Sequence, residues 1–564
     1  MSGKRKGRTQ TPPGKERGAG ERTPDAVICR TALAKRTTVA EQMKRSYREF
    51  AAHPALMTPE GWISFEELGE LANRALDLLA GEGVRFGDRI VLYLENSAIL
   101  RVLEHTILGE GLVRVALSPR LHPQEVAAIA ADCGAHVVCC APAAVESVRA
   151  FLAEAGAEAR VLPFSDREGG TTPASLALRP APLQVRRWPD VKGADPAMLM
   201  YSSGTTGRPK GAVVTHAGWA AQAELALAQL PAIGPGDVVL AAAPMTHFGG
   251  SIGLDCATVG AATVPMASFE PRPVLSALET FGVTVLPLAP ILLRRLVDEL
   301  ASSHSERSPR LRSVPYGGSS IDAGTLAAAA EYFPGVLAQF YGLAEALAPI
   351  SCLTPADHDA AIRDLQDPSA DHEEAMARLR SAGRVVEGMN VRLDEQGQII
   401  VRGDTVMAGY WNREELTRRA LDGEGWFSTG DIGVIDSQGY LRIVDRLNDV
   451  IISGGFNIYP AEVEQVIEEI PFVREAVVLG APHERWGEGV YAAVVLEPDA
   501  AKEFDGDAGP ENLLKALTDA CRSRLASYKK PLGVRMVEEI PRNAAGKIDR
   551  NRLRESFWTT SRKA

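Results

Sequence analysis

A loop rich in glycine and hydroxyl residues, with one lysine, carries the sharpest chemical signal in this sequence. Residues 201–211 read YSSGTTGRPKG and follow the apolar run 197–201 directly. Glycine lets backbone amides approach an anion closely, hydroxyls donate further hydrogen bonds, and lysine adds a point charge. A polar surface turn would not need this combination, and the spacing differs from that of the common nucleoside-triphosphatase loop. We therefore predict a polyphosphate-binding loop made by Ser202, Ser203, Gly204, Thr205, Thr206, Gly207 and Lys210.

Several other segments hold groups that suit nucleotide or acid chemistry, although each is ordinary when taken alone. A single histidine, such as His247 in the segment 244–250, is more often a hydrogen-bonded core residue than a functional one. The glycine–serine stretch 316–320 reads as a turn, and the Thr-Gly-Asp at 429–431 is common loop chemistry. A lysine beside a glycine, such as Lys547, usually serves solubility. Their order along the chain is therefore more informative than any one of them.

Taken in order, these segments resemble the motifs of the adenylate-forming superfamily, which includes acyl-CoA synthetases, adenylation domains of peptide synthetases and luciferases. The resemblance extends from about residue 56 to residue 553. It implies an enzyme that uses ATP and Mg²⁺ to adenylate a small acid, aromatic acids included, and that releases pyrophosphate. The activated group then passes to a second acceptor, and CoA is the first expectation for it.

The resemblance implies roles for individual residues in nucleotide binding. Tyr341 stacks on adenine, Asp431 accepts both ribose hydroxyls, and Arg446 adds a second ribose or phosphate contact. Glu345 binds Mg²⁺, a hard cation that prefers oxygen ligands, together with Thr205. Beyond the phosphate loop, the implied ATP-binding residues are Gly318, Ser319, Ser320, Tyr341, Gly342, Asp431 and Arg446.

The resemblance also implies the residues that act on the acid. Lys547 matches the catalytic lysine that bridges the two reacting partners, and His247 and Glu345 are the other expected catalytic residues. Ala344 departs from the family, because a threonine that contacts the α-phosphate is usual there, and losing one hydroxyl contact costs about 1 kcal/mol. Small residues leave room for a compact or aromatic acid. The implied pocket consists of His247, Phe248, Gly249, Tyr316, Gly317, Ala344 and Ala346.

The C-terminal part is expected to move between the two half-reactions. Asn448 occupies the hinge position, where the family has Asp or Lys, and asparagine tolerates left-handed backbone angles. Gly454 and Gly455 match the acceptor tunnel, where a pantetheine arm passes the backbone. The acceptor stays open between CoA and a carrier protein or amine of a natural-product pathway, and the latter group includes activation of an oxyanion such as nitrite. A non-catalytic adenylate sensor is the alternative from another class.

The elements that must position these residues form an α/β pattern. Helical and strand patterns alternate over 22–164, with a capping box of Ser64 and Glu67 before a helix and strand-like runs at 89–94 and 136–140. We therefore predict a large N-terminal domain of stacked α/β sheets plus a distorted barrel subdomain, followed by a small mobile α+β C-terminal domain. The expected divisions are a disordered basic tail at 1–21, the large domain at 22–445 with an exposed helical insert at 357–379, and the small domain at 446–564.

Length and composition exclude several classes of protein. The chain has 564 residues, of which 45% are hydrophobic and 24% charged, as in soluble proteins of more than one domain. A net charge of −11 gives no drive toward nucleic acid or an anionic membrane, and neither is an expected partner. The seven scattered cysteines fit buried thiols in a reducing compartment, and residues 1–21 do not have the apolar segment expected of a secretory signal. A cytoplasmic location follows as an expectation, and the family resemblance adds that of a homodimer.

Overall fold

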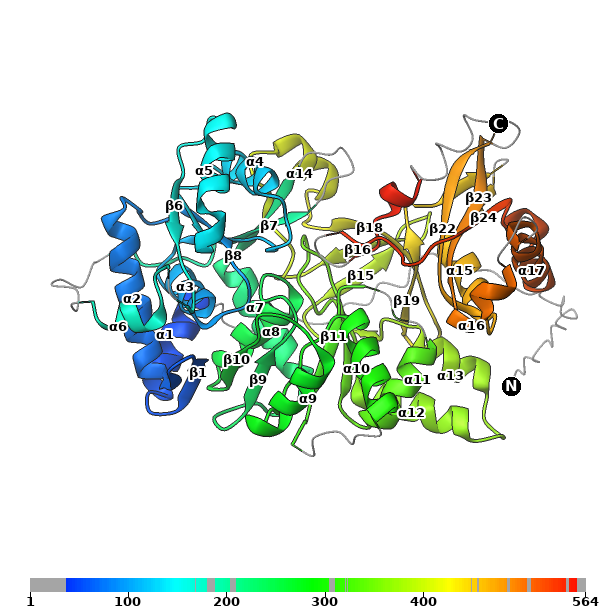
Figure 1. Ribbon diagram of the computed structural model, residues 1–564, viewed down its shortest axis with the longest axis horizontal. Coiled ribbons are helices and arrows are strands. Elements are labelled where there is room, and N and C mark those ends of the chain that lie inside the picture. Colours follow the sequence, from blue (N-terminus) through cyan, green and yellow to red (C-terminus); the bar gives the residue numbers. More distant parts are fainter. Residues whose placement is uncertain are drawn as a thin grey trace, which may run out of the picture.

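The structure is a computed structural model of the chain. It describes residues 37–167, 169–179, 188–202, 209–303, 310–319, 321, 323–447, 449–453, 456–483, 487–504, 509–543 and 547–554. Four sheets of the described part belong to a large body and a fifth to a smaller unit at the C-terminal end (Figure 1). This mixed α/β architecture with a large and a small part confirms the predicted fold class. The expected tail at 1–21 lies outside the described residues.

A seven-stranded sheet holds the segment that carries the predicted phosphate loop. Its strands, in spatial order, are β17 (Gly409–Tyr410), β8 (Lys210–Thr215), β7 (Pro196–Ser202), β4 (Val113–Ala116), β3 (Arg89–Tyr93), β5 (Val137–Cys140) and β6 (Arg160–Pro163). The runs predicted as strands at 89–94 and 136–140 are confirmed as β3 and β5. The antiparallel pair β7 and β8 ends and begins on either side of 203–208, so the sheet fixes both ends of that loop.

Helices cover the sheets of the large body on the outside (Figure 1). The capping box is confirmed, because the Glu67 amide donates to Ser64 Oγ at 3.2 Å and the Ser64 amide donates to Glu67 Oε2 at 2.7 Å. The helices before the insert are α1 (Val39–Glu49), α2 (Phe65–Gly81), α3 (Ala98–Gly109), α4 (Pro123–Cys133), α5 (Val145–Glu154), α6 (Pro173–Ala177), α7 (His216–Ala228), α8 (Phe248–Ala257), α9 (Pro271–Thr280), α10 (Pro290–Ser303) and α11 (Ala323–Tyr332).

Two four-stranded sheets complete the core beside the predicted acid pocket. The first joins, in spatial order, β2 (Gly61–Ser64), β1 (Pro54–Thr58), β10 (Ala262–Pro265) and β9 (Val238–Ala241). The second joins β11 (Val314–Gly317), β12 (Leu337–Tyr341), β13 (Ser351–Leu353) and β14 (Arg384–Val385). Strands β11 and β12 are parallel, with Gly317 opposite Phe340. Their carboxyl ends therefore present predicted site residues at one edge, where open α/β sheets bind ligands.

An antiparallel sheet forms the part predicted as the barrel subdomain. Its strands, in spatial order, are β15 (Asn390–Leu393), β16 (Gln398–Arg402), β18 (Phe427–Ile435) and β19 (Leu441–Arg446). The short helix α14 (Glu414–Ala420) precedes β18. The β18–β19 register places Asp431 directly opposite Arg446. One hairpin thus positions both residues expected at the ribose.

The small C-terminal unit has a sheet and a core of its own. Its elements are β20 (Ile451–Ser453), β21 (Phe456–Ile458), α15 (Pro460–Glu468), β22 (Val473–His483), β23 (Gly487–Leu496), α16 (Pro498–Ala501), α17 (Gly509–Arg524) and β24 (Gly533–Met536). Its two hydrophobic clusters contain only residues from 451 onward. The cores of the two parts are therefore separated by the few residues between β19 and β20.

The polar segment 357–379 is helical, as predicted, but it is not simply exposed. It forms α12 (Pro355–Gln366) and α13 (His372–Leu379), which pack against each other. Five side chains of the two helices are buried, namely Asp357, His358, Ala361, Ala375 and Leu379. The sequence does not predict this packing, because two of the buried side chains are polar and so look like surface residues.

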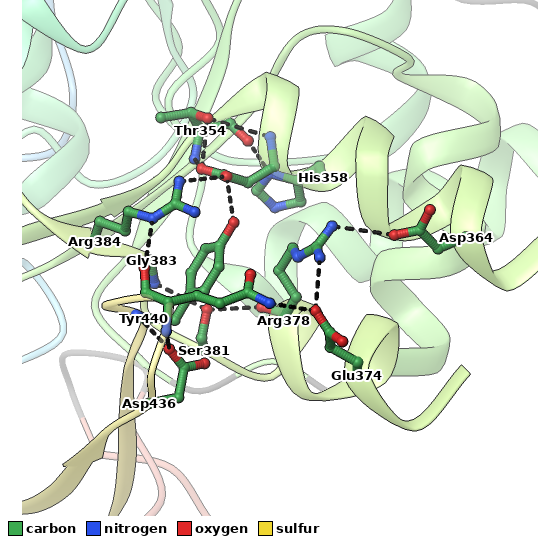
Figure 2. Close-up of polar contacts among 12 residues, drawn as sticks. Thr354, His358, Asp364, Glu374, Arg378, Ser381, Gly383, Arg384, Asp436 and Tyr440 are labelled. Atoms are coloured by element: carbon green, nitrogen blue, oxygen red, sulfur yellow. Dashed lines mark hydrogen bonds and ion pairs between the residues drawn. The ribbon is translucent and has the colours of Figure 1, made fainter. Parts of the chain in front are cut away.

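A polar cluster fastens this insert to the β18–β19 hairpin (Figure 2). Tyr440 donates its hydroxyl to Asp357 Oδ1 at 2.7 Å, and Thr354 Oγ1 donates to Asp357 Oδ2 at 2.6 Å. The guanidinium of Arg384 lies 4.1 Å from the centroid of the Tyr440 ring and that of Arg378 lies 5.8 Å from it. Burial opposes ionisation of Asp357, but hydrogen bonds from Thr354 and Tyr440 outweigh it and lower the pKa of Asp357.

Replacing Tyr440 with phenylalanine should destabilise the large body by about 1–2 kcal/mol at pH 7, because a buried carboxylate loses a donor. The folded pKa of Asp357 lies below its usual value of 3.8, so this contribution is present above that value. It is lost as the pH falls through the folded pKa. Urea unfolding of wild type and Tyr440→Phe between about pH 7 and pH 3 measures the difference. A difference that stays constant over this range would contradict the assignment to an ionised Asp357.

Candidate active site

The first cluster of predicted residues joins the phosphate-loop lysine to the predicted metal ligand. Lys210, the first residue of β8, has its Nζ atom 3.0 Å from Oε1 of Glu345, in the segment after β12. The hydroxyl of Tyr410 accepts a hydrogen bond from Lys210 Nζ at 2.7 Å and donates one to Glu345 Oε1 at 2.8 Å. These three residues come from three separate stretches of sequence. The fold therefore assembles a cation, a carboxylate and a phenol at the end of the predicted loop.

The second cluster lies at the hairpin expected to hold the ribose. The Tyr341 hydroxyl donates to Asp431 Oδ2 at 2.7 Å, and Arg446 Nε lies 3.3 Å from Asp431 Oδ1. Asp431 is only 4% exposed. Burial raises the pKa of Asp431, while Arg446 and the Tyr341 hydroxyl act in the opposite direction. The carboxylate is thus held in place by two neighbours before any ligand binds.

Lys547 reaches this region from the small unit. Two hydrogen bonds join it to Asn543, since the Lys547 amide donates to Asn543 Oδ1 at 3.0 Å and the Asn543 amide donates to the Lys547 carbonyl at 2.7 Å. Its side chain is exposed to the cleft. Desolvation by the surrounding protein, followed by the charge of Arg446, lowers the pKa of Lys547. The charges of Asp431 and Glu345 oppose the shift. Both predicted clusters therefore act electrostatically on the one lysine.

An interdomain cleft of about 3200 Å³ opens between the large body and the small unit. Typical small-molecule pockets measure about 300–1,000 Å³, so the cleft is far wider than one ligand requires. In Figure 1 the red C-terminal segment extends from the small unit toward β16 and β18. The predicted site residues that line the cleft are Gly318, Ser319, Tyr341, Gly342, Asp431, Arg446 and Lys547.

The residues expected beside the acid are closely packed. His247 lies just before α8, with its Nδ1 atom 2.8 Å from Thr246 Oγ1, and burial followed by the charge of Lys547 lowers the pKa of His247 to about 4. The histidine is therefore neutral at physiological pH. Phe248 packs edge-on against Phe340, with ring centroids 5.9 Å apart.

Neighbouring atoms lie so close to the backbone at two positions of the predicted pocket that only glycine fits there. A Cβ atom at Gly317 would lie 2.4 Å from the Phe340 carbonyl oxygen, and one at Gly249 would lie 2.9 Å from the Ala243 Cβ atom. Both distances are shorter than a carbon atom allows, so a larger residue would displace the backbone that forms this wall.

Tyr316 and Ala346, which were also expected at the pocket, are fully buried and are not among the described residues that line the cleft. The Tyr316 hydroxyl donates to Nε2 of His358 at 2.7 Å, and Nδ1 of that histidine donates to the Thr354 carbonyl. Successive side chains of a strand face opposite sides of the sheet, so Tyr316 points toward α12 while Gly317 faces Phe248. Ala344 is partly exposed.

Several predicted residues lie outside the described residues or have no described side chain. This applies to Ser202, Ser203, Gly204, Thr205, Thr206, Gly207, Ser320, Asn448, Gly454 and Gly455.

The described residues contain no group of three or more His, Cys, Asp and Glu side chains that could hold a metal ion. Glu345 alone suits Mg²⁺ that arrives with ATP, because this ion is usually held by one or two carboxylates plus substrate phosphates. In the part of the chain with described structure, no helix has the length and apolar character needed to cross a membrane.

Tyr410 is the functional candidate that the sequence patterns do not single out. It lies 200 residues from Lys210 and 65 from Glu345 along the chain. Locally it is only the first residue of an aromatic pair after Gly409, a pattern that indicates a buried core position. Pairing of β17 with β8 places it opposite Ala212 and so beside the loop lysine. Such a pairing cannot be derived from local sequence.

The chain is similar in sequence and in structure to several known proteins. The AMP-binding enzyme family matches residues 43–411, and the AMP-binding enzyme C-terminal domain matches residues 462–547. The chain is 32% identical over 519 residues to the long-chain-fatty-acid–CoA ligase FadD13 of Mycobacterium tuberculosis (strain ATCC 25618 / H37Rv), covering 88% of this chain and 94% of that ligase. It is 32% identical over 518 residues to the fatty acid–[acyl-carrier-protein] ligase ScoC of Streptomyces coeruleorubidus, covering 90% and 94%. The structure of amide bond synthetase McbA from Marinactinospora thermotolerans superposes with a TM-score of 0.77 at 28% identity, covering 92% of this chain and 100% of McbA.

Proposed function

The chain belongs to the AMP-binding enzyme family, and from this premise we propose that it adenylates a small acid and passes the activated group to CoA. An ATP-using acid ligase is the class that this membership establishes. The observation that carries the proposal is that Asp431 and Lys547 both line the cleft between the two parts of the chain, and that Glu345, which pairs with Lys210, acts electrostatically on Lys547. These groups supply the charges that a triphosphate, its metal and a ribose require.

In the proposed first step, a carboxylate of the acid attacks the α-phosphorus of Mg·ATP and pyrophosphate leaves. Asp431 accepts the ribose hydroxyls and Tyr341 lies against adenine, while Lys210 and Glu345 bind the phosphates and their Mg²⁺. Lys547 neutralises the charge that develops between the two reacting groups. Catalysis is then mainly positioning and preorganised electrostatics.

In the proposed second step, the small unit rotates about Asn448, withdraws Lys547 and presents Gly454 and Gly455 to the acceptor, which attacks the acyl carbon and displaces AMP. The short connection between β19 and β20 supports this, because the two bodies have separate cores on either side of it. Rotation of one body about a few residues is a common way to change an active site between steps.

The acid is proposed to be compact or aromatic, because small residues such as Gly249 and Gly317 leave space there and Phe248 supplies an aromatic ring. Transfer to an amine is the second candidate, and it is supported by the similarity to an amide bond synthetase. Transfer to a carrier protein follows from the similarity to a carrier-protein ligase. The three acceptors share the first step and differ only in the second.

We expect pyrophosphate exchange into ATP that depends on one class of small acid, followed by formation of its CoA thioester. The exchange is measured with a panel of aliphatic, aromatic and amino acids, and the acceptor by mass spectrometry after addition of CoA, a carrier protein or an amine. A product with the amine or the carrier protein alone would replace CoA as the acceptor. Tight binding of Mg·ATP without exchange for any acid would favour the adenylate sensor instead.

A further inference from the structure

Tyr410 connects the lysine of the phosphate loop to the glutamate expected to bind Mg²⁺. Its hydroxyl accepts from Lys210 Nζ at 2.7 Å and donates to Glu345 Oε1 at 2.8 Å, while Nζ and Oε1 lie 3.0 Å apart. The same ammonium lies 4.4 Å from the centroid of the Tyr410 ring, within the range of a cation–π interaction. The three side chains form a closed triangle of contacts, which we call the Lys–Tyr–Glu triangle.

The position of Tyr410 is set by its backbone and not by the two charged groups. Its strand pairs with β8, and its amide donates to Thr417 Oγ1 at 2.9 Å. Gly409 before it has a φ of +147°, and a Cβ atom there would lie 2.7 Å from Thr417 Cγ2. Only 9% of Tyr410 is exposed. The hydroxyl is therefore held at a fixed point before substrate arrives.

We propose that Tyr410 is a positioning residue for the binding of Mg·ATP, an inference that rests on the proposed function. In the free protein Lys210 and Glu345 neutralise each other directly. Phosphate oxygens and Mg²⁺ compete for these two groups when substrate binds, so the direct pair must be exchanged for contacts to substrate. The uncharged hydroxyl keeps one hydrogen bond to each side chain during this exchange and holds both near the phosphates.

The chemistry of the phenol suits this role. Its hydroxyl accepts a hydrogen bond from Lys210 and donates one to Glu345. A carboxylate accepts only and an ammonium donates only, so a single hydroxyl satisfies both at once. Phenylalanine keeps the ring under the ammonium but removes this link.

Tyr410→Phe tests the inference through the affinities for Mg·ATP and for AMP, each measured by calorimetry. Affinity for Mg·ATP should fall by about tenfold, because Lys210 and Glu345 are no longer held in place once their direct pair is broken, and ordering them costs binding free energy. Affinity for AMP should change by less than about twofold, because AMP brings neither β- and γ-phosphates nor their metal. In a Lys210→Ala background, Tyr410→Phe should have a smaller further effect, because only the hydrogen bond to Glu345 is left to lose.

Tyr440→Phe is the matched control, because its hydroxyl also donates to a carboxylate at 2.7 Å and a cation also lies 4.1 Å from its ring centroid (Figure 2). It should leave both affinities unchanged. Equal losses for Mg·ATP and AMP, an equal loss in the control, or no loss in Tyr410→Phe would each overturn the positioning role. Absence of Mg·ATP binding by the wild-type chain would instead overturn the proposed function.

Discussion

Replacing Lys547 with alanine should slow adenylate formation by about a hundredfold to a thousandfold, the usual cost of removing one preorganised donor from developing charge. Transfer from a preformed adenylate should proceed at the wild-type rate. The physical reason is position, since Lys547 stands in the cleft with Asp431 and is electrostatically coupled to Glu345. The proposed rotation removes it before transfer begins. Acid-dependent pyrophosphate exchange measures the first step, and conversion of a synthetic acyl-adenylate to the CoA thioester measures the second.

Lys515→Ala provides the matched control for this prediction. Lys515 belongs to the same small unit, but it lies on the exposed surface of α17 and pairs with Asp519 at 2.7 Å. Its loss removes one positive charge without touching the cleft, so both half-reactions should be unchanged. Equal loss of the two half-reactions in Lys547→Ala would show that the lysine does not act in the first step alone.

The second large effect is expected for Asp431→Asn, which keeps the shape of the side chain but removes its charge. Affinity for Mg·ATP should fall by about a hundredfold, since two hydrogen bonds to a charged group contribute about 1.5 kcal/mol each. The amide also turns a donor toward either Tyr341 or Arg446, which both donate to the carboxylate. Unlike Tyr410→Phe, this variant should lower the affinity for AMP as strongly as the affinity for ATP, because both nucleotides carry the ribose. Calorimetry with the two nucleotides measures this pattern.

Asp237→Asn is a suitable control for Asp431→Asn. Asp237 is also buried and paired with an arginine, with its Oδ1 atom 2.7 Å from Arg312 Nη1, but it is not among the described residues that line the cleft. A loss of charge there should lower stability and leave nucleotide affinity unchanged. If Asp431→Asn lost affinity for ATP but kept that for AMP, Asp431 would belong to the phosphate region and not to the ribose.

The sequence alone predicted the fold class and most of the candidate residues. Local signals suffice where the physics is local, as for the capping box of Ser64 and Glu67 or the buried strands β3 and β5. The order of short motifs supplied the family, because each motif needs its residue types at fixed spacing. It also gave Lys210, Glu345 and Lys547 without indicating how near they lie to one another.

The tertiary structure decided what depends on contacts between distant segments. Strand alternation turns Tyr316 into the core beside His358, although its neighbour Gly317 faces Phe248. The polar insert packs against the hairpin through the hydrogen bond from Tyr440 to Asp357, two residues that lie far apart in the sequence. Tyr410 gains its role in the same way, because a two-residue edge strand carries it to the start of β8. Strand pairing joins segments without regard to their separation in sequence, so spacing along the chain cannot predict such a neighbour.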